Sequence, residues 1–104
     1  MHKDNRLAPR YPLSAMAEVT DSRGAEMGVQ IMEISACGCR FLSKERLSVG
    51  TEITIRIRTE SDDFQASATV VRSTRMGTGV MFNKVNTASL RVLEKWLMAT
   101  TITR

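Results

Sequence analysis

Residues 52–59, with the sequence EITIRIRT, show the strictest alternation of apolar and polar side chains in the chain. In an extended backbone, Ile53, Ile55 and Ile57 point to one side and the polar residues between them point to the other. This period of two is typical of a β-strand with one buried face. The segment therefore predicts a half-buried strand and makes β-structure the starting point for the fold.

Most of the remaining chain has the pattern of further short strands separated by turn signals such as TDSRGAE. In the longest of them, Ala66, Ala68 and Val70 form a plausible inner face. Asp62 and Asp63 fall in the preceding turn, where we expect solvated carboxylates rather than a catalytic pair. The predicted strands besides 52–59 are residues 14–19, 28–35, 38–42, 64–73 and 79–82.

The pattern changes after residue 86, where apolar residues recur at helical spacing. Residues 87–100 place Leu90, Leu93, Trp96 and Leu97 on one face of an amphipathic helix. Asn86 or Thr87 is the expected N-cap, because both side chains can accept a hydrogen bond from the first turn. About six strands and one terminal helix predict an all-β fold with one helix, a small barrel with the helix closing one end.

Length and charge are those of one ordinary globular domain. The chain has 104 residues and a formal net charge of +4, and arginine outnumbers lysine. Arginine suits forked contacts with phosphate and stacking on flat rings. No apolar run approaches the roughly 20 residues that span a bilayer. The N-terminus also lacks a hydrophobic signal-type stretch, so we expect a cytoplasmic protein without membrane insertion.

Residues for catalysis or metal binding are scarce. His2 is the only histidine, and it lies near the N-terminus, where it cannot readily serve a nucleophile in the barrel. Cys37 and Cys39 are two residues apart, which is poor spacing for a mutual disulfide, and a zinc site would need further ligands. No glycine-rich phosphate loop of the Walker type is present. We therefore expect no enzyme activity, no metal, no cofactor, and cysteines that are structural and unligated.

Two arginines four residues apart stand in the N-terminal stretch NRLAPRYP. Pro9 and Pro12 argue against a helix around Arg6 and Arg10 and favour a restricted, extended arm. Exposed arginines in such an arm are most often only solvated. The prolines, however, reduce the entropy lost if the arm is pinned onto a ligand.

A second polar constellation occurs in MEISACGCRF. If Met32 and Ile34 face the core, Glu33 and Ser35 share the outer face at the end of their strand. Gly38 then lies in a tight turn, where it either adopts a positive φ or permits close backbone approach. A carboxylate there can accept from N–H groups such as those of a guanine edge. Taken alone, the same pattern also fits a polar strand end and a routine hairpin glycine.

Together the two stretches resemble the paired signature of the PilZ domain family. Arg6-x-x-x-Arg10 matches the family's R-x-x-x-R, and Glu33-x-Ser35-x-x-Gly38 resembles its D/N-x-S-x-x-G. The segment VVRSTRMGTGVMF also resembles the family's closing hairpin. The resemblance implies a six-stranded antiparallel barrel with a C-terminal helix that binds cyclic di-GMP, a bacterial second messenger. It divides the chain into a flexible arm, residues 1–12, and a barrel with its helix, residues 13–104.

The resemblance also implies roles for individual residues. Arg6 and Arg10 would grip phosphates and guanine edges, and Ser35 and Gly38 would provide contacts from the barrel. Glu33 occupies the Asp/Asn position, which keeps the charge but moves the carboxylate one methylene further out. Arg72 and Arg75, near the end of the long strand, are candidates for an additional stacking or phosphate contact, and Arg75 is included as a possible ligand residue.

Three hypotheses for function remain open at this point. The first is a second-messenger effector that binds cyclic di-GMP, changes conformation and regulates a protein partner. The second is a PilZ-like adaptor with weak or no nucleotide binding, which Glu33 favours. The third is a barrel that binds single-stranded nucleic acid. The scarcity of aromatic residues, at 5%, speaks against the third, and no DNA or RNA partner is expected.

Overall fold

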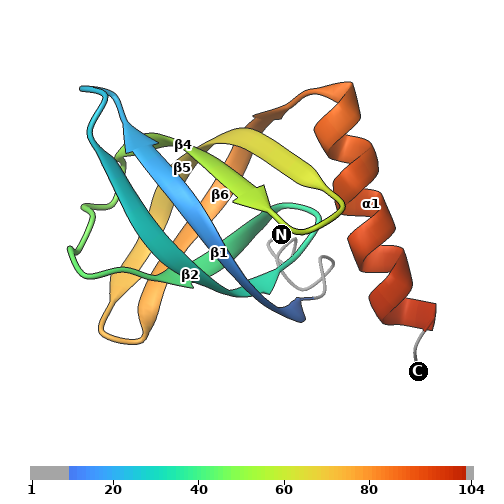
Figure 1. Ribbon diagram of the computed structural model, residues 1–104. Helices are drawn as coiled ribbons and strands as arrows, with labels where there is room; N and C mark the ends of the chain where they lie inside the picture. Colours follow the sequence, from blue (N-terminus) through green and yellow to red (C-terminus); the bar gives the residue numbers. More distant parts are fainter. Residues whose placement is uncertain (1–9, 103–104) are drawn as a thin grey trace, which may run out of the picture.

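The computed structural model describes the backbone of residues 10–102 and the side chains of residues 10–99. Arg6 and most of the predicted arm therefore lie outside the described residues. Figure 1 shows a strand-rich body with one helix beside it. Its elements, in chain order, are β1 (Tyr11–Asp21), β2 (Glu26–Ile34), β3 (Gly38–Leu42), β4 (Glu52–Arg58), β5 (Asp63–Thr74), β6 (Gly77–Val85) and α1 (Thr87–Ile102).

The six strands form a closed barrel in the order β1-β2-β3-β6-β5-β4. Every neighbouring pair is antiparallel, and pairing of β1 with β4 closes the sheet on itself. Closure removes the unpaired edges that an open sheet would expose. The predicted six-stranded antiparallel barrel with a C-terminal helix is confirmed.

The barrel interior is filled by the inward residues of the alternating strands. In β4, Ile53, Ile55 and Ile57 are buried, as the alternation predicts. Ala66, Ala68 and Val70 of β5 are buried as well. Phe41 and Phe64 are the largest fully buried side chains, so they occupy much of the interior. Removing such a ring typically costs about 3–5 kcal/mol, because the surrounding barrel cannot collapse into the space.

The alternation breaks in β2, and one core prediction is wrong there. Ile31 and Ile34 are both fully buried, although they are three residues apart. A bulge between Ile31 and Glu33 in the pairing with β3 shifts the phase of the strand. Met32 is consequently half-buried instead of in the core. Glu33, the first residue paired with β3 after the bulge, is half-buried.

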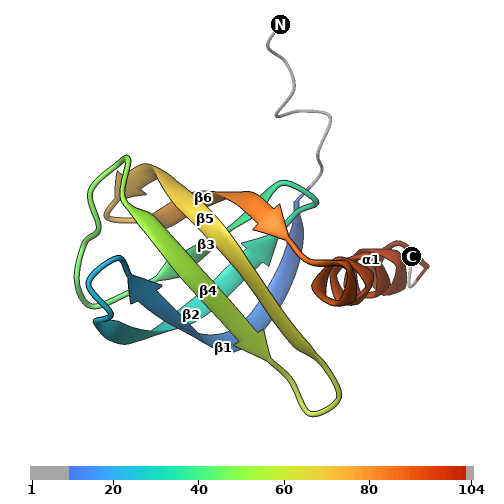
Figure 2. The same cartoon turned by 90° about the horizontal axis from the view of Figure 1, so that it is seen from above.

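Helix α1 begins at the predicted N-cap region and packs at one end of the barrel. Asn86 is the cap, since its Oδ1 accepts from the backbone N–H of Ser89 at 2.8 Å. Leu93 is buried in the core, and the ring of Trp96 lies 5.9 Å from that of Phe64. Leu90, which was predicted on the buried face, is 42% exposed. Figure 2 shows the helix lying outside the barrel, beyond the end of β6.

The turn between β4 and β5 fastens the helix to the barrel. The Asp62 carboxylate accepts hydrogen bonds from Lys95 Nζ at 3.1 Å and from Trp96 Nε1 at 3.2 Å. The expectation of a solvated carboxylate is wrong for Asp62, whose side chain is only 12% exposed. Asp63 instead forms an ion pair with Arg56 across the neighbouring strands β4 and β5, with 2.7 Å between Asp63 Oδ2 and Arg56 Nη2.

Strand β1 begins two residues earlier than the expected boundary between arm and barrel. Tyr11 pairs with Ile34, and Pro12 pairs with Glu33. Arg10 therefore directly precedes a strand whose register places it beside the end of β2. Within the described part of the chain, no helix is long and apolar enough to cross a membrane.

Candidate functional site

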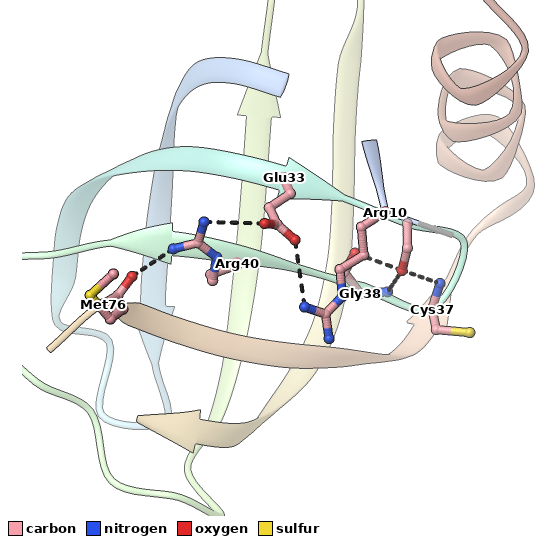
Figure 3. Close-up of polar contacts among 7 residues, drawn as sticks. Arg10, Glu33, Cys37, Gly38, Arg40 and Met76 are labelled. Carbon is pink, nitrogen blue, oxygen red and sulfur yellow. Dashed lines mark hydrogen bonds and ion pairs between the residues drawn. The ribbon is translucent and has the colours of Figure 1, made fainter. Parts of the chain in front are cut away.

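A groove with a volume of about 380 Å³ crosses the outer surface of the barrel near the start of β3. Its lining includes four predicted site residues, namely Arg10, Glu33, Ser35 and Gly38. Residues from the two separate sequence stretches are thus brought together by the pairing of β1 with β2. Figure 3 shows Arg10 and Arg40 on either side of Glu33, with Gly38 to the right, next to Arg10 and Cys37.

Strand alternation predicted that the Ser35 side chain points outward, but in the structure Ser35 is buried. It is 7% exposed, and its Oγ accepts hydrogen bonds from the backbone N–H groups of Cys37 and Gly38 at 3.1 and 3.2 Å. Its hydroxyl also lies 3.3 Å from the carbonyl oxygen of Gly38, to which it donates. This is the serine version of a side-chain-to-backbone turn. Ser35 therefore shapes the turn between β2 and β3.

Position 38 requires glycine because the backbones of β3 and β6 approach each other closely there, and not because its φ is positive. A Cβ at this position would collide with the carbonyl oxygen of Val80 in β6. Gly38 does not occur among the glycines with positive φ in the described chain. The absence of a side chain lets β3 lie against β6, where Gly38 lines the groove.

Glu33 is held between two guanidinium groups. Its Oε2 accepts a hydrogen bond from Arg40 Nη2 at 3.1 Å, and its Oε1 lies 3.6 Å from Arg10 Nη1. The contact between Glu33 Oε1 and Arg10 Nη1 is therefore an ion pair that is too long for a hydrogen bond. Oε1 is buried, and no hydrogen-bond partner for it occurs among residues 10–99. A buried carboxylate oxygen without a donor is costly, so this atom is a ready acceptor.

Arg40 is a residue of the groove that the sequence interpretation missed. It lies on β3 between the buried residues Cys39 and Phe41, so alternation alone places its side chain outside. The pairing of 28–35 with 38–42 in a hairpin would also have placed it opposite Glu33. These two signals were present in the sequence. No local sequence pattern indicates the further hydrogen bond, which Arg40 Nη1 donates to the carbonyl oxygen of Met76 at 2.6 Å.

The groove combines positive charge with apolar surface. Its described charged residues are one carboxylate, that of Glu33, and three arginines, namely Arg10, Arg40 and Arg72. Val71 and Met81 are about half exposed and line the same groove. An anionic ligand with flat, partly apolar rings matches both properties.

Arg75 does not line this groove. It lies in a smaller pocket of about 160 Å³ beside the turn between β5 and β6, together with Lys44 and Arg46. Of the two arginines considered near the end of β5, the structure places Arg72 in the groove and Arg75 outside it.

The cysteines are both free thiols. Cys37 is exposed, whereas Cys39 is buried, and burial raises the pKa of the Cys39 thiol to about 12. No disulfide joins them, as the spacing predicted. Between residues 10 and 99 there is no group of three or more His, Cys, Asp or Glu side chains that would suit a metal ion.

Solved structures with a similar fold include two PilZ domains. The PilZ domain of CeSA from a cellulose-synthesizing bacterium superposes with a TM-score of 0.70 at 16% identity, covering 88% of this chain and 96% of that one. The PilZ domain of YcgR from Escherichia coli, solved with c-di-GMP, gives 0.70 at 13% identity, covering 92% and 91%. The Bacillus subtilis inhibitor of motility MotI/DgrA gives 0.77 at 12% identity, covering 93% of this chain and 51% of that one. At such low identities, these likenesses establish the fold.

Sequence comparison assigns the family independently of the fold. A comparison with curated protein sequences finds no match. The sequence profile of the PilZ domain, however, matches residues 4–99, which is nearly the whole chain. The matched range contains both arginines of the N-terminal motif and the Glu33–Gly38 stretch. The chain therefore belongs to the PilZ domain family.

Proposed function

We propose that this protein binds cyclic di-GMP in the groove beside Arg10 and acts as an effector rather than an enzyme. The observation that carries the proposal is the meeting of Arg10 with Glu33, Ser35 and Gly38 in one positively charged groove. Family membership supports the choice of ligand, as does the YcgR PilZ domain, whose structure was solved with c-di-GMP.

The chemistry of the ligand suits the groove. Cyclic di-GMP carries two phosphate charges and two guanine rings. Arg10, and Arg6 four residues before it in the sequence motif, would fork onto phosphate oxygens or onto guanine O6 and N7. The buried Oε1 of Glu33 would accept from the guanine N1–H or N2–H once Arg10 turns away. Val71 and Met81 offer apolar surface to the ring faces.

In this proposal, binding has a structural consequence for the N-terminal arm. A ligand that engages Arg6 and Arg10 together with the barrel would favour the docked arm over other arrangements, which is a population shift. The surface offered to a protein partner would then change in both shape and charge. The proposed output is thus regulation of a partner protein, with cyclic di-GMP as the only small ligand and no cofactor.

Isothermal titration calorimetry with cyclic di-GMP tests the proposal directly. GMP and cyclic di-AMP are the matched controls, since the first lacks the paired structure and the second lacks the guanine edge. We expect saturable heat with cyclic di-GMP alone. No heat at high ligand concentration, together with unchanged amide spectra of residues around Arg10, would refute the proposal.

A second candidate function is a protein-interaction adaptor with weak or no cyclic di-GMP binding. The ion pair between Arg10 and Glu33 favours the adaptor, because the Glu33 carboxylate already pairs with an arginine that is proposed to bind phosphate. Glu33→Asp distinguishes the two functions. Its shorter side chain retreats from Arg10, so a large gain in affinity from near zero indicates that the natural protein is the adaptor.

A further inference from the structure

Arg40 makes a bridge that the PilZ signature does not include. One arm of its guanidinium donates to Glu33 Oε2 at 3.1 Å, and the other donates to the carbonyl oxygen of Met76 at 2.6 Å. The bridge joins β2 to the turn between β5 and β6, across the face of β3 (Figure 3). An arginine suits this geometry, because its planar fork presents two donors in fixed directions.

The neighbouring turn is shaped to accept the Arg40 side chain. Gly77 has a φ of +134°, and a Cβ there would lie only 3.2 Å from Arg40 Nη1 and 3.3 Å from Arg40 Cγ. A larger residue would therefore crowd the guanidinium as well as strain the backbone. Arg40 and Glu33 are both partly buried, with side chains 31% and 27% exposed. The bridge is thus packed into the surface instead of extending into solvent.

The bridge determines which oxygen of Glu33 remains available. Oε2 accepts from Arg40, whereas Oε1 is buried, lies toward Arg10 and accepts no hydrogen bond from the part of the chain that the structure describes. A glutamate without such an anchor can rotate about three side-chain bonds. It could then form a closer, forked pair with Arg10 and lose its orientation toward the groove. Both changes oppose a ligand that needs Arg10 and an accepting oxygen.

We propose that Arg40 is a positioning residue of this site, which fixes Glu33 through the bridge to the Met76 carbonyl and thereby sets ligand affinity without contacting the ligand. The part of this inference that concerns ligand affinity rests on the proposed function, because it requires that the protein binds cyclic di-GMP. The structural part, that Arg40 controls the pairing of Glu33 with Arg10, is argued only from the contacts of Arg40 and Glu33.

A double-mutant cycle on cyclic di-GMP binding separates positioning from direct contact. Arg40→Met removes both donors but keeps an unbranched apolar stem over the surface. We expect it to weaken binding about tenfold, an effect within the range for directly coupled neighbours. In a Glu33→Ala background, the same Arg40 substitution should change affinity less than about twofold, because the residue it positions is gone.

Arg58→Met on β4 is the matched control, since it removes an exposed arginine from another face of the barrel. It should leave affinity within about twofold of wild type if the effect of Arg40 is local. An equal loss from Arg40→Met in both Glu33 backgrounds would overturn the proposal, because Arg40 would then act on the ligand directly or on folding alone. Should Arg40→Met fail to fold, Arg40→Lys, which keeps the charge but not the fork, takes its place in the same cycle.

Arginine side-chain NMR tests the positioning role without ligand. We expect the Arg10 Nε–H signal to shift in Arg40→Met and to remain in place in Arg58→Met. An Arg10 signal that ignores the Arg40 substitution would overturn the inference. If wild-type protein shows no heat with cyclic di-GMP, the proposed function fails, and the NMR result alone decides whether Arg40 positions Glu33.

Discussion

Arg10 Nη1 lies 3.6 Å from Glu33 Oε1, so an ion pair joins the residue before β1 to the penultimate residue of β2. The Arg10 side chain is 60% exposed, and such surface pairs contribute only about 0–1 kcal/mol. A hydrogen bond to a charged group in a partly desolvated site contributes about 1.5–3 kcal/mol. A phosphate can therefore replace Glu33 as the partner of Arg10 without a large penalty.

The first prediction concerns Arg10 itself. Arg10→Ala should lose most cyclic di-GMP binding, by about 10- to 150-fold, because it removes a charge-assisted contact worth about 1.5–3 kcal/mol. Folding stability should change by less than about 1 kcal/mol, since the lost ion pair is exposed. Calorimetric titration and urea unfolding measure the two quantities separately.

Arg23→Ala provides the control for Arg10→Ala, because Arg23 is an exposed arginine in the turn between β1 and β2 and does not line the groove. Its affinity should equal that of wild type. If Arg10→Ala and Arg23→Ala bind equally well, Arg10 has no role in recognition.

The second prediction concerns the close approach at Gly38. Gly38→Ala should destabilise the barrel by about 1–3 kcal/mol or more, because the new methyl group collides with the backbone of Val80, which cannot rotate away. Gly28→Ala is the matched control, since Gly28 is also in a strand but no atom lies within 4 Å of the added Cβ. Urea unfolding of both variants gives the comparison, and equal stability of the two would contradict the packing argument.

The sequence predicts the strands well because alternation is a local property. In β4 the three isoleucines are buried as expected, and nothing interrupts the period. In β2 a bulge between Ile31 and Glu33 shifts the phase, which moves Met32 out of the core and leaves Ile31 and Ile34 inside. A bulge depends on the partner strand, so the sequence of β2 alone does not reveal it.

The paired motifs point to four residues that the structure gathers in one groove, but they miss Arg40 and do not give the geometry of the groove. Arg10, Glu33, Ser35 and Gly38 line one groove, as the paired motifs suggest. Ser35 turns into its own hairpin, because its hydroxyl satisfies backbone N–H groups that the tight turn would leave unpaired. The bond from Arg40 to the Met76 carbonyl spans 36 residues, and only the closed barrel brings these two residues together.

The third prediction concerns the different reactivities of the two thiols. Cys37 is exposed, whereas Cys39 is buried with a pKa raised to about 12 by loss of hydration. Because the thiolate is the reactive form, a thiol reagent at pH 8 should modify Cys37 rapidly and leave Cys39 intact in the folded protein. Mass spectrometry should find one adduct before unfolding and two after it. Rapid modification of Cys39 in the native protein would show that the barrel opens near the β2–β3 turn.

The fourth prediction concerns the pH dependence of helix docking through Asp62. The hydrogen bond from Lys95 is the main cause that lowers the pKa of the Asp62 carboxyl, and the Trp96 indole N–H also contributes. A carboxyl whose pKa is lower in the folded than in the unfolded state stabilises the fold above its unfolded pKa of about 3.9. That contribution is lost as the pH falls through the folded pKa. The stability difference between wild type and Asp62→Asn should therefore be largest near neutral pH and shrink below about pH 4.

Trp96 provides the local readout for this prediction, because it is the only tryptophan in the chain and its Nε1 donates to Asp62 Oδ2. Asp62→Asn should alter Trp96 fluorescence at neutral pH, as acidification alters it in wild type. Asp63→Asn is the matched control: Asp63 also has a lowered pKa, but its partner is Arg56 within the sheet, away from the helix. It should change acid stability while leaving Trp96 fluorescence unaffected. Identical fluorescence changes in the two variants would show that the helix responds to the hairpin as a whole and not to the Asp62 carboxylate.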